Sequence, residues 1–401
     1  MGVGGWTNRV LVLGVGLLMG AAPVAAADLG GDCCADLEER VAELEATTAR
    51  KGNRKVSLTI SGWVNQAVFA WDDGVERNVY VGTNALEQDR FRFLGEAKIA
   101  DGWSAGYLLE IGVNSADSKS FSQDNDENAA SVASVVIRKS AWFIKSKELG
   151  KLTLGRYDTA TYHLIDNVDT LLTRNVSDYE AAGVAIGAFQ IRQGGAPVGT
   201  TTWINVMGGF NNGTPGQSGL RDVVRYDTPT FAGFTATTSW GEDDQWEAAL
   251  NYRGELGDFK VNGAIGYGES TDPDTNAAQC AATVGTGDCR WWAAGALVQH
   301  TPTGLFVYGG YGANEIDLTP AQAAAGADDQ SHTAYIQAGI ERKWLALGKT
   351  NIFGEYRRDD VGLTKGADGS KLDLWVSSLS CGDGTRLPTF VGAHVASDDG
   401  V

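Results

Sequence analysis

The feature that most constrains the fold of this 401-residue chain is an alternation of apolar and polar side chains with period two. It is visible in Val56–Ser61 (VSLTIS), in Glu96–Ile99 (EAKI) and, near the end, in Lys371–Ser378 (KLDLWVSS). Because successive side chains of a β-strand point to opposite faces, each such run predicts a strand with one apolar and one polar face. The runs and the turn signals between them predict about fourteen strands.

The connections between these runs are alternately very short and long. Asp101–Gly102 and Gly254–Gly257 (GELG) are tight turns, whereas Asn114–Asn128 is a long polar connection. Outer-membrane barrels show this asymmetry, and a closed barrel pairs every backbone donor in lipid without leaving edges. We therefore expect an all-β fold, a transmembrane antiparallel β-barrel over residues 55–380, rather than a secreted soluble sandwich.

Aromatic residues recur near the ends of the predicted strands, where the interfacial girdles of a membrane barrel require them. Any one of them alone would fit ordinary core packing, so the inference depends on their recurrence. They are Trp71, Trp103, Trp240, Trp246, Tyr308 and Trp344.

The net charge of −18 argues against nucleic acid as a partner, because no basic cluster is large enough to neutralise phosphates. The same charge fits surface loops that only keep the protein soluble, so it does not by itself indicate a filter. Outside the N-terminus no apolar run reaches the ~18–20 residues of a membrane helix.

The first residues have the pattern of a secretory signal. Arg9 supplies the positive charge, Val10–Ala22 is apolar, and Ala25, Ala26 and Ala27 offer small side chains for cleavage. We expect residues 1–27 to be removed.

Residues 28–54 contain a predicted periplasmic helix, Asp36–Lys51, with a narrow apolar seam of Leu37, Val41 and Leu44. About two heptads are too few for an independent coiled coil. Either this helix docks on its own barrel, or copies of it meet in an oligomer.

Export would permit disulfides among the five cysteines. Cys280 and Cys289 bracket a short polar segment with two glycines, which predicts a local disulfide. Adjacent Cys33 and Cys34 cannot easily bridge each other, so they could pair between chains, and the partner of Cys381 is left open. No histidine lies near either pair, which disfavours a metal site, and we expect no metal and no cofactor.

The longest connection follows Lys151–Arg156 (KLTLGR) and runs from Tyr157 to Leu220. If the first strand rises from the periplasm, this segment follows the fifth strand and is the third outer loop. We interpret residues 157–220 as a loop that folds back into the barrel and narrows it.

Over roughly Asp28 to Trp375 the chain resembles the general porins of alphaproteobacterial outer membranes. The matching stretches are Asp36–Lys51 with Lys55–Trp63 (KVSLTISGW), then Arg90–Ile99 (RFRFLGEAKI), Lys151–Arg156 and Val224–Phe234 (VRYDTPTFAGF). The resemblance implies a multi-pass barrel of sixteen strands, a homotrimer embedded in bacterial outer-membrane lipid. It also implies passive diffusion of small hydrophilic solutes past a third loop folded into the lumen.

A diffusion pore needs charges of both signs facing each other at a narrow place. Arg90 and Arg92 share the strand face opposite Phe91, and with Arg138 they form a predicted basic wall. Arg156 also belongs to the predicted constriction, although strict alternation would turn it outward. Alternatively, all these charges are independently solvated. The predicted acidic side of the constriction is Asp158, Asp166, Asp169, Asp178 and Glu180.

Enzymatic functions find little support in the sequence. The four histidines form no metal-spaced pair, and no G-x-S-x-G or phosphate-binding loop is present. Some barrels are lipases or proteases, but we expect no enzyme. The main alternative to a diffusion porin is a structural or adhesin-like outer-membrane barrel without open conductance.

Residues 381–401 do not continue the alternation. Porins of the resembled kind close with two further strands, the last ending in an aromatic residue, and neither is evident. We expect a truncation or frameshift after Trp375 and a barrel that is incomplete at its seam.

Overall fold

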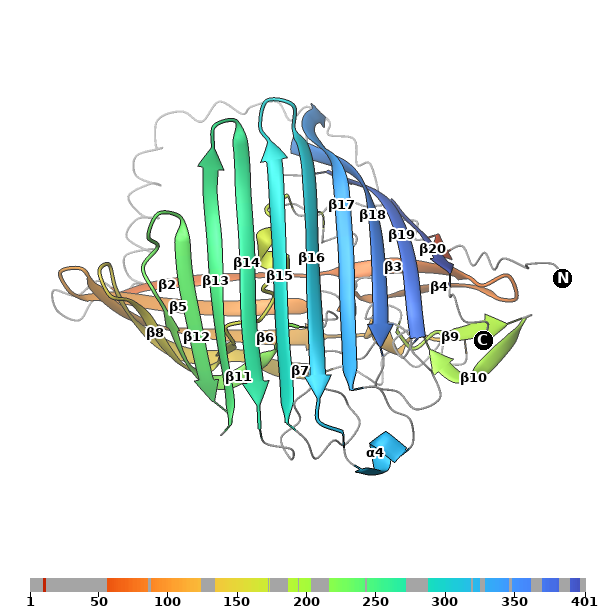
Figure 1. Cartoon of the computed structure of the whole chain (residues 1–401), viewed down its shortest axis with the longest axis horizontal. Coiled ribbons are helices and arrows are strands. Elements are labelled where there is room, and N and C mark those ends of the chain that lie inside the picture. The colour runs from red at the N-terminus through yellow and green to blue at the C-terminus, as the bar shows by residue number, and fades with distance from the viewer. Residues whose placement is uncertain are drawn as a thin grey trace, which may run out of the picture.

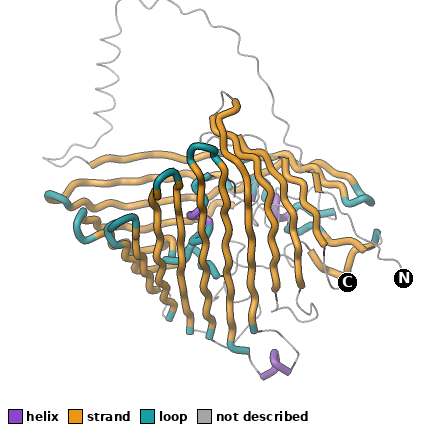
Figure 2. The backbone as a smooth tube through the Cα atoms, turned by 45° about the horizontal axis from the view of Figure 1, so that its top comes forward, coloured by secondary structure: helices purple, strands orange, loops and turns teal. Residues whose placement is uncertain are grey.

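The computed structural model describes residues 10–11, 56–85, 88–123, 134–171, 173, 187–193, 195–202, 216–241, 244–271, 288–318, 320–324, 329–345, 348–361, 370–381 and 390–396. Its main body is one strongly curved antiparallel sheet of sixteen strands (Figures 1 and 2). In spatial order these are β1, β20, β19, β18, β17, β16, β15, β14, β13, β12, β11, β8, β7, β6, β5 and β2.

Apart from Val10–Leu11 and Phe390–Ala396, the strands of this sheet lie where the sequence predicts alternating runs. In chain order they are β1 (Val10–Leu11), β2 (Val56–Trp63), β5 (Asp89–Ala100), β6 (Trp103–Asn114), β7 (Ser134–Ser146), β8 (Gly150–Asp158), β11 (Leu220–Asp227), β12 (Phe234–Gly241), β13 (Gln245–Leu256), β14 (Phe259–Ser270), β15 (Cys289–His300), β16 (Leu305–Ile316), β17 (Gln330–Leu345), β18 (Gly348–Val361), β19 (Ser370–Cys381) and β20 (Phe390–Ala396).

Short and long connections lie at opposite ends of the strands, as the sequence predicts (Figure 1). Asp101–Gly102 joins β5 to β6, with Gly102 in the left-handed region at φ 74°, which glycine adopts without steric cost. At the other end, the connection from β16 to β17 is long enough to contain the helix α4 (Pro320–Ala324).

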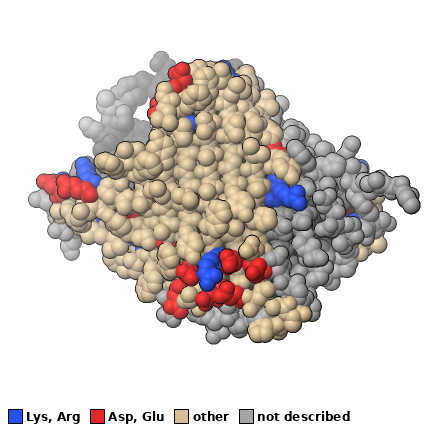
Figure 3. Space-filling model, viewed as in Figure 1, with Lys and Arg blue, Asp and Glu red and all other residues tan. Residues whose placement is uncertain are grey.

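The two faces of the sheet differ in polarity. On β13, Gln245 and Glu247 are buried on the concave side, whereas Trp246 and Leu250 are exposed on the convex side. The convex face is uncharged over most of its height, and its acidic and basic side chains gather near the strand ends (Figure 3). This is the division expected of a wall with lipid outside and polar groups inside.

Two aromatic belts cross the convex face of the sheet at different heights. The loop-side belt lies on the side of the long connections. Its rings contact one another, as in the pair Trp292 and Tyr311, whose ring centroids are 4.9 Å apart. The belt consists of Trp240, Trp246, Tyr267, Trp292 and Tyr311. The belt on the side of the short turns, the turn-side belt, consists of Phe234, Tyr252 and Phe259.

Two of the aromatic residues predicted for these girdles lie elsewhere. Trp71 is buried and stacks on Phe189 with ring centroids 4.1 Å apart. Tyr308 is buried on the concave side of β16, where its hydroxyl donates to the carbonyl oxygen of Ile165 at 3.1 Å. Position near a strand end did not reveal which face each side chain takes.

The strand that begins at Val56 belongs to the main sheet only as far as Trp63, where the chain leaves that sheet. The Asp89 carboxylate accepts hydrogen bonds from the backbone N–H of Asn65 at 2.5 Å and from Gln66 Nε2 at 2.9 Å. A separate hairpin follows, made of β3 (Gln66–Asp72) and β4 (Arg77–Thr83). The adjacent apolar residues Trp63 and Val64, followed by the adjacent polar residues Asn65 and Gln66, interrupt the alternation at this break.

The long segment 157–220 is described in three parts, at its beginning, in its middle and at its end. Its middle forms a second hairpin, β9 (Gln190–Gln193) and β10 (Ala196–Thr202), beside β3 and β4. Phe189 packs there against Trp71 and Tyr80, and Arg192 Nε lies 2.7 Å from Asp73 Oδ2. This part of the predicted inward loop therefore associates with the first hairpin.

The beginning of the segment, by contrast, packs on the concave face of the sheet and contains the 3-10 turn η4 (Asp166–Val168). Leu164, Ile165 and Val168 form one buried apolar cluster with inward side chains of β13 to β18. Glycines in the wall leave room for them: a Cβ on Gly310 would lie only 2.4 Å from Ile165 Cγ2.

The ends of the main sheet are β2 and β1, and no pairing between described residues joins them. The expectation that no strand follows Cys381 is wrong, since β20 pairs with β19. β1 pairs with β20 and lies within the predicted signal segment. The predicted helix Asp36–Lys51 lies outside the described residues, and none of the described helices is long and apolar enough to cross a membrane.

Candidate functional site

A buried carboxylate on β6, Glu110, is the centre of the candidate site. Its side chain is fully shielded from solvent, and it lies opposite Arg92 on β5. Arg92 donates two hydrogen bonds to Glu110 Oε2, that from Nε at 2.8 Å, and Arg90 Nη1 lies 3.9 Å from Oε1. Phe91 between them is exposed on the other face, so both arginines point inward as predicted.

Arg138 reaches the same carboxylate because β7 contains a bulge. The register between β6 and β7 shifts by one residue after the pair Glu110–Lys139, which leaves Arg138 as the extra residue. A bulge re-aims side chains, and here two consecutive ones turn inward. Arg138 Nε donates to Glu110 Oε1 at 3.1 Å, and Lys139 Nζ lies 2.6 Å from Asp158 Oδ1.

Arg225 on β11 holds the point where β8 ends and the inward segment begins. Its guanidinium donates to the carbonyl oxygens of Asp158 at 3.1 Å and Thr159 at 3.0 Å. The same group forms an ion pair with Asp227 at 2.7 Å. The first residues of the segment are therefore fixed to β11 by a charged donor.

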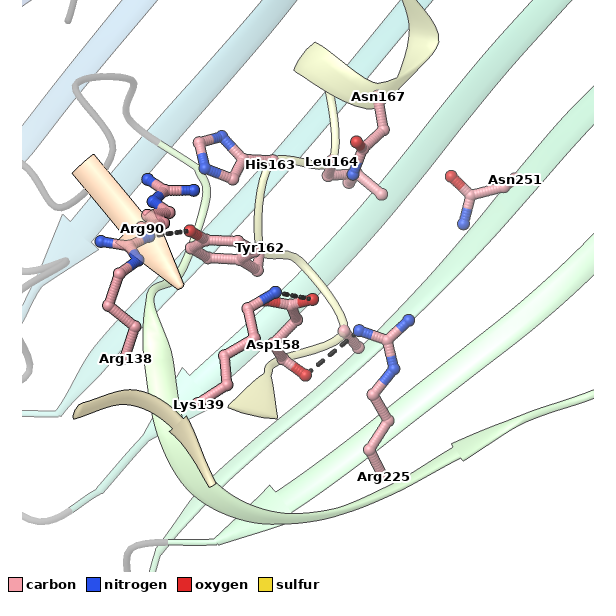
Figure 4. A pocket seen from close by; sticks show the side chains of 11 residues that line it. Arg90, Arg138, Lys139, Asp158, Tyr162, His163, Leu164, Asn167, Arg225 and Asn251 are labelled. Carbon is pink, nitrogen blue, oxygen red and sulfur yellow. Dashed lines mark hydrogen bonds and ion pairs between the residues drawn. The ribbon is translucent and has the colours of Figure 1, made fainter. Parts of the chain in front are cut away.

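These side chains enclose a polar cavity of about 270 Å³ between the inward segment and the wall (Figure 4). Tyr162 extends across it, and Arg138 Nη2 lies 3.4 Å from the Tyr162 hydroxyl. Four basic side chains line the cavity against one carboxylate, that of Asp158. The basic ones are Arg90, Arg138, Lys139 and Arg225.

The acidic residues predicted for the loop have different positions. Asp158 faces the basic side chains. Asp166 and Asp169 instead bind their own segment: Asp166 Oδ2 lies 2.6 Å from His163 Nδ1, and Asp169 accepts from the N–H of Leu171 at 2.9 Å. Asp178 and Glu180 lie outside the described residues.

Arg156 does not join the basic group. It lies opposite Asp222 of β11 and two residues from Leu154, on the face that strict alternation assigns to the outside. It makes no ion pair with any residue in the described part of the chain. The structure therefore separates Arg156 from the three arginines with which it was grouped.

The inward segment is tied to the wall by a second buried carboxylate, Glu247 of β13. Thr161 donates to Glu247 Oε2 from both its backbone N–H and its hydroxyl, each at 2.7 Å. The Thr161 hydroxyl also accepts from Trp291 Nε1 at 3.0 Å and from the N–H of Ser218 at 3.1 Å. Both ends of the 157–220 segment thus meet at one buried threonine, which we call the Thr161 clamp.

Sequence reasoning missed Glu110, Lys139, Arg225 and Glu247. For Glu110 a signal existed, because it alternates with Leu109 and Ile111 and so belongs to the polar face. Arg225 alternates in the same way with Val224 and Tyr226. Lys139 gave no such signal, since its inward position results from the bulge.

Cys289 at the start of β15 is disulfide-bonded and buried. Its predicted partner, Cys280, lies outside the described residues, so the pairing stays a prediction. Within the described residues, no group of three histidine, cysteine, aspartate or glutamate side chains could hold a metal ion.

The sequence model of the family described as Gram-negative porins matches residues 14–376 of the chain. No curated protein sequence matches it. Solved structures with a similar fold include OmpF of Salmonella typhi in complex with daunomycin, at 13% identity, covering 87% of this chain and 98% of that chain with a TM-score of 0.49. The anion-selective porin from Comamonas acidovorans has 15% identity, coverage of 85% and 98%, and a TM-score of 0.49. With TM-scores this low, the assignment rests on the family match.

Proposed function

This chain belongs to the Gram-negative porin family, and from that premise we propose that it is a general diffusion porin whose third outer loop narrows the barrel. The protein is an outer-membrane β-barrel channel. The finer proposal is that small hydrophilic solutes and ions pass passively between the inward segment and the basic wall.

The observation that supports this proposal is the cavity between segment 159–171 and the strands β5, β7, β8 and β11. One side of the segment is fixed to β13–β18 by its apolar cluster and the Thr161 clamp. The other side of the segment faces the charged side chains that line the cavity. Apolar packing does not fill the space between the segment and these side chains. A narrow, water-accessible passage lined by charge is what a selective diffusion pore requires.

The charges of this cavity favour small anions over cations. Four basic groups line it against Asp158, and the further carboxylates that bind them, Glu110 and Asp227, leave an excess of positive charge. In a confined site of low dielectric such an excess acts more strongly than in bulk water.

Recording single channels in a planar bilayer tests the proposal. The wild-type protein should open stepwise and prefer chloride, and Arg138→Ala should lower the chloride-to-potassium permeability ratio by a few-fold, since one cavity charge is lost. Arg156→Ala is the matched control, because it removes an arginine from the other face of the wall and should leave the ratio unchanged.

Two results would count against the proposal in different ways. A correctly folded protein that carries no current would favour a structural or adhesin-like barrel. The channel could instead conduct with the same selectivity in the wild type and in Arg138→Ala. That result would support the porin function but contradict the proposal that this cavity is the constriction.

We further propose that the protein assembles as a homotrimer, the state that its sequence resemblance implies. Chemical cross-linking in native outer membranes tests this directly: a ladder ending at three copies is expected, and a ladder ending at one or two would refute it.

A further inference from the structure

The exposed face of the wall contains one large hollow. Across β12 and β13 its outward side chains are small, namely Ala236, Thr238 and Ala248. Larger side chains surround these three, and together they bound a cavity of about 640 Å³ that is open to the outside. We call this hollow the wall groove; its surrounding residues are Tyr226, Leu250, Ile265, Tyr267 and Trp292.

The surface of the wall groove is apolar although three threonines contribute to it, of which Thr237 donates its hydroxyl to Asp227 Oδ1 at 2.9 Å. The Thr238 hydroxyl donates to the carbonyl oxygen of Glu247 at 2.9 Å. The Thr228 hydroxyl accepts from the N–H of Ala236 at 3.0 Å. Both hydroxyls are thus satisfied by neighbouring backbone, and the groove offers an occupant methyl groups and aromatic rings. An apolar occupant fits it, and a charged or strongly polar one would be desolvated without gaining hydrogen bonds.

The groove lies between the two aromatic belts. Tyr267 and Trp292 of the loop-side belt form one of its ends. At the other end, Phe234 and Tyr252 of the turn-side belt lie two residues beyond Ala236 and Leu250 on the same strands. Aromatic belts mark the depth at which a barrel meets the lipid headgroups, so the groove lies within the hydrocarbon layer between them.

A row of charged side chains borders the loop-side belt at the end of the groove. Glu269 pairs in register with both Trp246 and Arg290. Arg290 also lies 3.9 Å from Glu315 and 3.7 Å from Asp317. The sequence of surfaces along the wall is therefore charged row, aromatic belt and apolar groove, which is the order of polar headgroup, interface and acyl chain in one leaflet of a bilayer.

From this order we propose that the wall groove is a binding site for one acyl chain of an outer-leaflet membrane lipid. An empty hollow of this size would forfeit the dispersion contacts of every side chain that lines it. A flexible hydrocarbon chain restores them along the whole groove. A second copy of the protein is the less favoured occupant, because exposed belt residues such as Trp240 stand beside the groove, where the wall meets lipid.

The proposal rests on the outer-membrane location of the barrel and not on conduction. The test uses the full protein reconstituted in vesicles of phosphatidylethanolamine and phosphatidylglycerol. These contain a small fraction of phosphatidylcholine with a photoreactive group halfway along one acyl chain. After illumination, mass spectrometry of peptides locates the adducts. Ala248→Phe fills the groove, and Ala296→Phe places the same ring on the outward face of β15 away from it.

Adducts are expected to concentrate on the groove strands β12 and β13 in the wild type and in Ala296→Phe. They should fall by about tenfold on these strands in Ala248→Phe, which corresponds to ~1.4 kcal/mol of lost binding. Adducts spread evenly over the wall, or unchanged by Ala248→Phe, would overturn the proposal. The proposal would also be overturned if the wild type formed few adducts and Ala248→Phe no longer formed the oligomer. That result would identify a second copy of the protein as the occupant of the groove. Conductance measured on the same samples reports separately on the proposed pore.

Discussion

Glu110 is the residue on which three guanidinium groups converge, and it is buried completely. Two roles follow from this geometry. Its charge reduces the mutual repulsion of Arg90, Arg92 and Arg138, and its hydrogen bonds orient them. A buried ion pair from which one partner is removed leaves an uncompensated charge, which typically costs about 3–5 kcal/mol.

We therefore predict that Glu110→Gln, a substitution of equal shape, lowers the free energy of unfolding by an amount of that order. The variant that still folds should also prefer anions more strongly, because one negative charge behind the cavity is lost. Urea unfolding in vesicles measures the first effect, and the zero-current potential across a salt gradient measures the second.

Glu269→Gln is the control for Glu110→Gln, since Glu269 lies on the outward face of β14. It should alter neither quantity by a comparable amount. If Glu110→Gln left both stability and selectivity at their wild-type values, Glu110 would not organise the basic wall.

At the scale of one loop, the Thr161 clamp sets where the inward segment lies. Glu247 accepts from Thr161 twice and from Gln245 Nε2 at 2.6 Å, all in a fully buried position. Hydrogen bonds to a charged group contribute about 1.5–3 kcal/mol each. In Glu247→Gln a side-chain NH₂ would have to replace one accepting oxygen, and one donor would lose its partner.

Glu247→Gln is therefore predicted to raise amide hydrogen exchange in segment 159–171 by about tenfold or more, since ~1.4 kcal/mol of lost stability already gives that factor. Single-channel current should become noisier. Glu255→Gln, at the exposed turn-side end of the same strand, provides the comparison and should exchange like wild type. Equal exchange in both variants would mean that the apolar cluster alone holds the segment.

The two accessory hairpins, β3–β4 and β9–β10, are joined at Asp73, which lies outside the main sheet. Burial alone would raise the pKa of Asp73. The N–H groups of Glu76 and Val75 and the Arg192 guanidinium outweigh it and hold the pKa well below its usual value of 3.8. A carboxylate with a lowered pKa contributes stability above its unfolded value and loses it only as the pH falls through the folded value.

The contact between the hairpins should thus persist as the pH falls from about 7 to about 4, and open only at more acidic pH. Asp73→Asn should open it at every pH. Hydrogen exchange of residues 187–202 is the measurement. Asp72→Asn is the matched control, because among the described residues Asp72 accepts hydrogen bonds from Arg77 and from the N–H of Gly74, both within the first hairpin. Opening that begins already near neutral pH in the wild type would contradict the assignment to Asp73.

The alternation of apolar and polar residues shows on which face of a strand each side chain lies. It therefore predicted most of the strands and the inward positions of Arg90 and Arg92. It does not record pairing partners. For that reason it gave no sign of the bulge that turns Lys139 inward. The strand β20 was not predicted, because Phe390–Ala396 consists of small and apolar residues and its two faces differ little in polarity.

The candidate site was only partly predictable for the same physical reason. The inward positions of Arg90 and Arg92 follow from parity along a single strand. For the acidic residues of the loop, neither charge nor position in the sequence shows where the carboxylate points. Asp166 and Asp169 carry the right charge for a constriction, yet their carboxylates close turns of their own segment. A spacing rule cannot distinguish a charge that faces the lumen from one that caps a turn.

At the scale of the whole molecule, two electrostatic fields compete. The chain carries a net charge of −18, whereas the cavity lining carries an excess of basic groups. The Debye length is about 10 Å at ~0.1 M salt and about 3 Å at ~1 M. Loop charges farther from the path than these lengths are screened, but a solute in the cavity is in direct contact with Arg138 and Lys139.

We predict that the channel prefers chloride over potassium at ~0.1 M and still does so at ~1 M salt, with a permeability ratio that declines by less than tenfold. Zero-current potentials under a fixed potassium chloride gradient at the two mean concentrations test this. If the net charge of the chain governed permeation instead, the channel would prefer potassium at low salt and lose its preference at high salt. The two explanations therefore predict opposite signs of the potential at low salt, where the measurement is most sensitive.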